Sequence, residues 1–203
     1  MAEIKPFQGY LPPPDLVKKV SSPPYDVLSS DEARSITKKN SDSFLRVIKP
    51  ETDYEPGNEP EREALHHHAA ENLAGFIRSG SLIQDEEPCF YIYRISMDDH
   101  IQTGIIAAVS VQEYNQGLIK KHELTRSDKE DDRTLHIEIT NANTGPVFLT
   151  FRNKGGFQNQ ISNIINQKKD ITFQADDRTI HTLWKIKAPE ILESLKRYFE
   201  SIP

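Results

Sequence analysis

The densest group of ionisable side chains in this sequence is the stretch "KKHELTRSDKEDDR" at residues 120–133. Within it, Glu123 is a carboxylate flanked by His122 and Lys121. A carboxylate in such a setting can act as a general base toward an alcohol, and a neighbouring cation keeps it ionised. These residue types therefore indicate chemistry on a hydroxyl group.

Two further cations, Lys129 and Arg133, follow in the same stretch. Either side chain can hold a phosphate or a carboxylate, and arginine does so through a two-point fork. The alternative interpretation is a solvated, charged turn between two strands, which the spacing of the charges also fits.

A second candidate segment is "SSPPYDV" at residues 21–27, in which Tyr25 and Asp26 follow two prolines. Proline fixes the backbone angle φ, so the two polar side chains are held in defined positions, as a binding site requires. A rigid arm that only anchors the N-terminus explains the same pattern.

The motif "HHH" at residues 66–68 raises the question of a metal site. Consecutive helical residues point about 100° apart, so the three side chains cannot face one ion. His66 also has no histidine three or four residues along the chain. The pattern therefore predicts a solvated helix face.

Cys89 lacks the companions of a zinc site or a disulfide and is expected on a buried strand.

Composition places the chain among globular cytoplasmic proteins. It has 203 residues, a net charge of -6 and one cysteine. The acidic balance argues against a broad nucleic-acid-binding face. The N-terminus lacks the apolar run of a signal peptide, and no apolar stretch is long enough for a membrane span. Phosphate-binding glycine motifs and the GxSxG nucleophile motif are absent.

The elements that must position these residues follow from hydrophobic periodicity and from helix start and stop signals. The expected helices cover residues 29–40, 60–82, 156–169 and 189–202. The expected strands cover residues 43–50, 89–96, 100–114, 135–140, 144–151, 171–175 and 181–187, with 89–96 and 100–114 as a hairpin. The sequence predicts an α+β fold, with a mixed, mostly antiparallel sheet, flanking helices and a proline-rich N-terminal arm, in a single domain over residues 1–203.

Several motifs occur in the order of a known family: "SSPPYDV", "SFLRVIKPE", "TGIIAAVSVQEYNQGLIKKHELTRSDKEDDR", "NANTGPVFLTF" and "HTLWKI". Together they resemble the N-terminal half of the bacterial and archaeal family catalogued as domain of unknown function 1015, over residues 4–203. In that family the last helix leads into an Asp-Gly-His-His-Arg motif. The resemblance implies that these residues are the N-terminal part of a longer protein.

That additional motif is similar to the phosphate loop of the ParB-like fold, which free-serine kinases share. There, backbone N–H groups cradle nucleotide phosphates. Those kinases use the glutamate of a Pro-His-Glu segment as the base for the serine hydroxyl. By this resemblance His122 and Glu123 match the His-Glu pair, and Lys121 stands in place of the proline.

The first hypothesis is an enzyme that transfers a phosphoryl group from ATP or ADP, with Mg²⁺, to a small hydroxylated metabolite such as serine. Glu123 is the expected base beside His122, and Asp131 or Asp132 is a candidate Mg²⁺ ligand. The candidate substrate- or phosphate-binding residues are Tyr25, Asp26, Lys121, Thr125, Lys129 and Arg133.

The second hypothesis is a ParB-like regulatory module that binds a nucleotide or nucleic acid without catalysis. The absence of an aromatic-interleaved basic stripe counts against nucleic acid. The third is that residues 1–203 alone are an inactive scaffold, because catalysis that needs both halves of a site does not survive with one half. An apolar surface or strand edge left uncovered then predicts a homo-oligomer.

Overall fold

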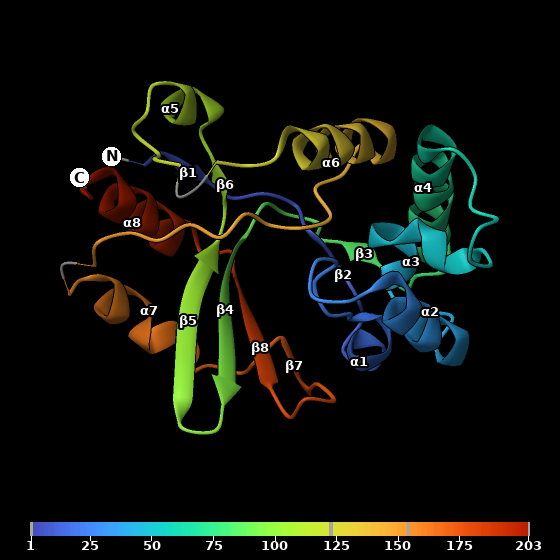
Figure 1. Cartoon of the computed structure of the whole chain (residues 1–203). Helices are drawn as coiled ribbons and strands as arrows, with labels where there is room; N and C mark the ends of the chain where they lie inside the picture. The colour runs from blue at the N-terminus through green and yellow to red at the C-terminus, as the bar shows by residue number, and fades with distance from the viewer. Residues whose placement is uncertain (1, 122–123, 154, 203) are drawn as a thin grey trace. The chain divides into compact units, whose positions relative to one another are not determined.

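The computed structural model describes residues 2–121, 124–153 and 155–202 (Figure 1). Its contacts divide the chain into two compact units. Unit 1 consists of Met1–Pro14, Gln84–Glu123 and Phe148–Pro203, and unit 2 consists of Asp15–Ile83 and Leu124–Val147. Helices and antiparallel sheets are both present, which confirms the predicted α+β class. Folding of the whole chain as a single domain stays a prediction.

Unit 1 contains a four-stranded antiparallel sheet with the strand order β5-β4-β8-β7. Its strands are β4 (Phe90–Met97), β5 (His100–Ile106), β7 (Ile171–Gln174) and β8 (Ile180–Ile186). Because β4 is central, Ile92 lies opposite Ile105 on one side and opposite Trp184 on the other. The predicted hairpin is confirmed, although its second strand is shorter than expected. The chain continues into β6 (Ala108–Val109), which pairs with β1 (Ile4–Lys5), and into α5 (Val111–Asn115).

Two amphipathic helices cover the sheet of unit 1, α7 (Phe157–Ile165) and α8 (Pro189–Glu200) (Figure 1). Their apolar residues recur at helical spacing, so each helix has one side that is stabilised by burial. Ile161 and Leu195 are fully buried in the same core as Ile92 and Trp184. Both helices and the strands β7 and β8 lie where the sequence predicted them.

Unit 2 is mostly helical. Its elements are α1 (Val17–Val20), α2 (Ser30–Lys39), α3 (Leu45–Ile48), the 3₁₀ helix η1 (Pro50–Asp53), α4 (Arg62–Arg78) and α6 (Ser127–Thr140). Helix α2 begins with a capping box, in which Ser29 and Glu32 exchange side-chain and backbone hydrogen bonds. The short strands β2 (Tyr10–Leu11) and β3 (Ile83–Gln84) complete the chain's elements over the described residues.

Three predicted strands are wrong. Residues 43–50 form α3 and the start of η1, because a single helical turn buries Leu45, Val47 and Ile48 between neighbouring helices. Residues 135–140 are the second half of α6. The alternation of apolar residues there imitates a strand, but the buried residues His136 and Thr140 are four apart, which is a helical spacing. Residues 144–151 contain no strand.

The interpretation of residues 120–133 as a charged turn between strands is also wrong for its second half, because α6 begins at Ser127. The proline-rich arm contains the short strands β1 and β2 and the helical turn α1. Val147 and Phe148 are 82% and 75% exposed. Self-association through exposed apolar side chains of this kind stays a prediction.

The backbone of Gly9 in unit 1 packs closely against the hydroxyl group of the buried residue Tyr91. A Cβ atom at Gly9 would lie 2.7 Å from the hydroxyl oxygen of Tyr91. That hydroxyl accepts from the Gly9 N–H at 2.8 Å and donates to Asp85 at 2.7 Å, and Asp85 also pairs with Lys185. Burial and the Asp85 carboxylate raise the pKa of Tyr91, so the hydroxyl keeps its proton.

We expect Gly9→Ala to lower the free energy of unfolding by about 1–3 kcal/mol, because Tyr91 cannot move without losing its bonds. Gly104→Ala is the matched control, since a Cβ atom at Gly104 meets nothing within 4 Å. Chemical denaturation of both variants measures the difference. Equal destabilisation by the two substitutions contradicts the assigned contact.

Candidate functional site

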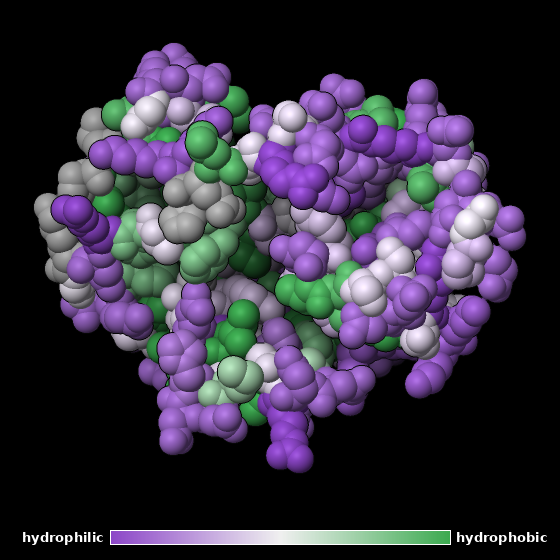
Figure 2. Space-filling view, viewed as in Figure 1, coloured by the Kyte–Doolittle hydropathy of each residue, from purple (hydrophilic) through white to green (hydrophobic). Residues whose placement is uncertain are grey.

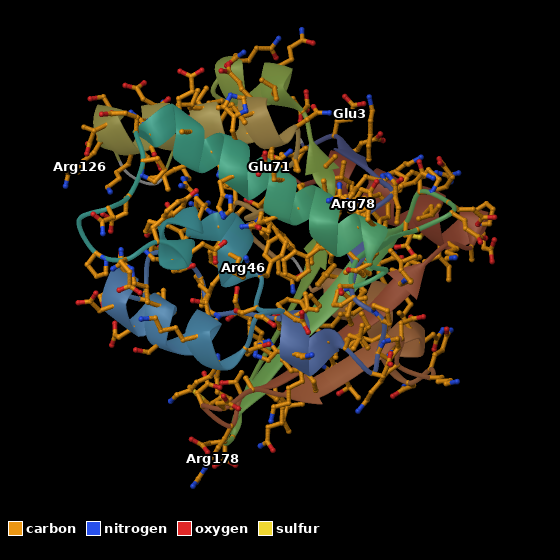
Figure 3. The ribbon with its side chains drawn as sticks, turned by 90° about the vertical axis from the view of Figure 1, so that its right-hand side faces the viewer. Glu3, Arg46, Glu71, Arg78, Arg126 and Arg178 are labelled. Carbon is orange, nitrogen blue, oxygen red and sulfur yellow. The ribbon has the colours of Figure 1, made fainter. Side chains whose placement is uncertain are left out.

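Helices α4 and α6 pack against each other in unit 2 and bring together ionisable side chains from distant parts of the sequence. In Figure 3, Glu71 and Arg78 mark α4, and Arg126 marks the start of α6. Charged and polar side chains dominate the surface over α6 in Figure 2. Between the helices lie five residues that are called the α4–α6 cluster below: Arg62, His66, Asp132, Arg133 and His136.

Helical spacing explains why these residues meet. On α4, His66 and Ala69 are buried three positions apart, so they lie on one side of the helix. On α6, Asp132, His136 and Thr140 follow one another at intervals of four, and the latter two are buried. The inner side of each helix thus carries a histidine.

A chain of hydrogen bonds runs through the cluster to a hydroxyl group. The Asp132 Oδ1 and His66 Nε2 atoms are 3.2 Å apart. The Nδ1 atoms of His66 and His136 are 3.3 Å apart, with an edge-to-face arrangement of the rings. The His136 Nε2 atom is 3.1 Å from Thr144 Oγ1. The order is therefore carboxylate, imidazole, imidazole, hydroxyl.

The protonation of the cluster follows from its surroundings. Burial lowers the pKa of His136 to about 4, and the nearby Arg133 and His66 act in the same direction. Burial also lowers the pKa of His66, although Asp132 opposes this. For Asp132, burial opposes ionisation, but the hydrogen bonds and charge of Arg133 outweigh it and lower the pKa. At neutral pH both imidazoles are neutral and the carboxylate is ionised.

Two guanidinium groups share the Asp132 carboxylate. Arg133 donates to Oδ2 through Nε at 3.2 Å and Nη2 at 2.7 Å, and Arg62 donates to Oδ1 at 3.1 Å. The Arg133 guanidinium also lies over the Tyr25 ring, 4.4 Å from its centroid, which is a cation–π distance. With neutral histidines, two cations face one anion, so the cluster carries one excess positive charge.

The structure brings together three residues that the sequence analysis singled out, namely Tyr25, Asp132 and Arg133. Four other described candidates lie on the surface of unit 2. Asp26 is exposed in a turn, and Lys129 and Asp131 are exposed on α6. Thr125 donates to Glu130 at 3.1 Å and is also exposed. These four residues remain candidates without a shared pocket among the described contacts.

Lys121, the candidate two residues before the expected base Glu123, belongs to unit 1. The Lys121 ammonium group lies 5.4 Å from the centroid of the Tyr114 ring. His122 and Glu123 lie outside the described residues.

The three consecutive histidines point in different directions, as the helix geometry requires. His67 is exposed. His68 contacts Asp53 of η1 at 2.7 Å, and His66 contacts α6. The prediction of a solvated face is wrong for His66, which is 4% exposed. Its histidine partner is 70 residues away. The only sequence signal for this group of residues was the spacing of four between Asp132 and His136, which places both on one side of a helix.

A second carboxylate, Asp53, is held on the other side of α4. It accepts two hydrogen bonds from Arg46, at 2.7 and 3.0 Å, one from Asn72 at 3.0 Å, and the His68 contact. All of its partners come from elements of unit 2 that pack together. This group therefore anchors α4 to η1.

Among the described residues, no three histidine, cysteine, aspartate or glutamate side chains share an arrangement that could hold a metal ion. The oxygens of Asp132 are engaged by Arg62, His66 and Arg133. Of the helices in the described ranges, none is long and apolar enough to cross a membrane.

Comparison with known proteins gives a family and no closer assignment. No curated protein and no solved structure matches the chain. One family model matches, and it extends over residues 4–203. Because this match covers almost the whole chain, the protein belongs to the family described as "Protein of unknown function (DUF1015)".

Proposed function

We propose that this protein takes part in nucleotide-dependent transfer of a phosphoryl group to a small hydroxylated metabolite such as serine. The observation that carries the proposal is the sharing of one carboxylate, Asp132, by two guanidinium groups, Arg62 and Arg133. The excess positive charge favours an anionic ligand, and a fixed arginine fork matches the oxygens of a phosphate.

The arrangement of Arg133 supports this role. Its ring contact with Tyr25 and its bonds to Asp132 fix the guanidinium plane before any ligand arrives. Catalysis of phosphoryl transfer depends largely on positioning and on stabilising negative charge. Lys129 lies one helical turn before Arg133 and can add a second cation for the phosphate.

The remaining parts of the proposal come from the sequence. Glu123, beside His122, is the proposed base for the acceptor hydroxyl. Lys121, Thr125 and Asp26 are proposed ligand contacts, and Mg²⁺ accompanies ATP or ADP. A cytoplasmic location is proposed with this activity, consistent with a buried free thiol at Cys89.

The test combines binding and turnover. Isothermal titration with ATP and ADP in the presence of Mg²⁺ measures nucleotide binding, and mass spectrometry detects phosphoserine formed from serine. We expect Arg133→Gln to weaken nucleotide binding by about 10- to 100-fold, the effect of losing a charged hydrogen-bond donor. Glu123→Gln is expected to abolish turnover and to leave binding in place.

Arg126→Gln is the matched control, because Arg126 is an exposed arginine that precedes α6 and pairs with Asp128. It is expected to bind as the unsubstituted protein does. Absence of nucleotide binding by the unsubstituted protein overturns the proposal. Binding without phosphoserine favours the alternative function, a ParB-like regulatory module.

A further inference from the structure

Thr144 lies at the end of the hydrogen-bonded chain and is not used in the proposed function. It follows α6, which ends at Asn141 in the left-handed conformation with φ 51°. This conformation turns the chain back at the end of a helix. The Thr140 hydroxyl donates to the His136 carbonyl at 2.6 Å, within the last turn of α6. The fold thus places the Thr144 hydroxyl on the imidazole of His136.

The direction of each hydrogen bond follows from the ionised carboxylate. Asp132 can only accept, so His66 carries its proton on Nε2. His66 Nδ1 is then an acceptor, and the proton between the rings belongs to His136 Nδ1. His136 Nε2 is consequently an acceptor, and Thr144 must donate its hydroxyl proton to it.

This arrangement has the logic of a serine–histidine–aspartate triad, with one additional imidazole between the base and the carboxylate. A nucleophilic hydroxyl requires an adjacent base that is itself oriented by a third group. Here His136 Nε2 contacts the hydroxyl, His66 orients His136, and Asp132 orients His66. Three successive bonds therefore act on one hydroxyl group.

The groups around the two imidazoles determine where positive charge can form. His136 is 1% exposed and is affected by Arg133 and His66, so a charge there is unfavourable. His66 is next to Asp132, which stabilises a charge on its ring, with Arg133 and Arg62 opposing. A proton taken by His136 Nε2 is thus balanced by transfer of the Nδ1 proton to His66. The residue that takes the hydroxyl proton, His136, is therefore different from the residue that carries the positive charge, His66.

We propose that Thr144 is a covalent phosphoryl acceptor, activated by His136, His66 and Asp132, and that the phosphoryl group reaches the metabolite through phosphothreonine. The identity of the donor and of the final acceptor rests on the function proposed above. In the first step the Thr144 oxygen forms a bond to the terminal phosphorus of the nucleotide, and the bond from that phosphorus to the bridging oxygen breaks, so that the shortened nucleotide leaves. The hydroxyl proton passes to His136.

In the second step the hydroxyl of the metabolite attacks the same phosphorus and gives its proton to the proposed base, Glu123. The bond from the phosphorus to the Thr144 oxygen breaks, and this oxygen takes back the proton held by His136. The position of Thr144 is compatible with this role, because the residue is only half-buried. A Cβ atom on the neighbouring Gly145 would meet nothing within 4 Å, so the backbone beside Thr144 borders open space.

The experiment uses the whole chain and two phosphoryl donors, Mg²⁺–ATP and acetyl phosphate. Acetyl phosphate needs no nucleotide site, so its result is independent of nucleotide binding. Peptide mapping by mass spectrometry locates the label. We expect phosphothreonine at Thr144, no label in Thr144→Val, and labelling that is at least about 100-fold slower in His136→Gln, the lower end of the range for loss of a general base. Thr134→Val, an exposed threonine of α6, is the control and should be labelled normally.

Two further variants distinguish activation of the Thr144 hydroxyl by the histidines from a purely structural role of these residues. Thr144→Ser should be labelled on the serine at position 144. This variant tests the site even if Thr144→Val folds poorly. In His66→Gln the rate of labelling at Thr144 should depend on pH in a different way, because His66 is a positioning residue that receives the positive charge. A structural role of His66 changes the yield of folded protein and leaves the profile of the folded fraction unchanged.

The outcomes distinguish this inference from the proposed function. Phosphoserine formed without any label at Thr144 overturns the inference and leaves the proposed function standing. Label at Thr144 from acetyl phosphate, without phosphoserine from either donor, supports the inference and overturns the proposed function. Absence of both products, or label that is equal in the Thr144→Val variant, overturns the inference.

Discussion

Acidification from about pH 6.5 to about pH 4 is expected to remove about 3 kcal/mol from the free energy of unfolding, and most of this loss should disappear in His136→Gln. The pKa of His136 is about 4 in the folded protein and 6.5 when unperturbed, mainly because burial disfavours its charged form. Each unit of pKa difference corresponds to about 1.4 kcal/mol, which gives the expected size.

The sign follows from proton linkage. Between these two pH values the unfolded chain binds a proton at His136 and the folded chain does not. The contribution is therefore fully present above about pH 6.5 and is lost as the pH falls toward about 4. The lowered pKa of His66 acts in the same direction, and that of Asp132 adds a further loss at lower pH.

Urea denaturation at a series of pH values, followed by circular dichroism, measures this dependence. Glutamine keeps hydrogen-bonding groups at position 136 and removes the titration. His67→Gln is the matched control, since the His67 side chain is 64% exposed, and it should follow the curve of the unsubstituted protein. A curve that is flat over this pH range for the unsubstituted protein contradicts the assigned burial of His136.

The substitutions Leu195→Ala and Leu45→Ala are each expected to lower the free energy of unfolding by about 2–5 kcal/mol. Both leucines have 0% exposure, Leu195 in the core of unit 1 and Leu45 in a core cluster of unit 2. Truncation removes buried apolar area and leaves a cavity that the surrounding helices can only partly close. Leu124→Ala is the control, because Leu124 is 96% exposed.

The same pair of variants tests whether the chain is a single folding domain. Trp184 is the only tryptophan and belongs to unit 1, so its fluorescence follows the unfolding of that unit. If the two units unfold cooperatively, Leu45→Ala shifts the fluorescence transition as much as Leu195→Ala does. If they unfold separately, Leu45→Ala shifts only the helical signal in circular dichroism. An effect below about 0.5 kcal/mol from either core substitution, the range of surface changes, contradicts the assigned cores.

The sequence by itself determined the elements whose signals are local. Helix α2 has its capping residues within one turn, and β4 and β5 are joined by a tight turn, so neighbouring residues suffice to define them. The order of the motifs also identified the family, which the match over residues 4–203 confirms. Tyr25 and Arg133 were both selected as candidates because of their residue types, and they do meet.

Only the tertiary structure decided which short apolar segments become strands and which charged residues meet. Residues 43–50 and 135–140 are too short for their periodicity to distinguish a helix from a strand, and packing within unit 2 made both helical. The pairing of His66 with His136 joins residues 70 positions apart. No local pattern specifies such a contact, because it depends on how α4 and α6 pack and on the burial that keeps both rings neutral.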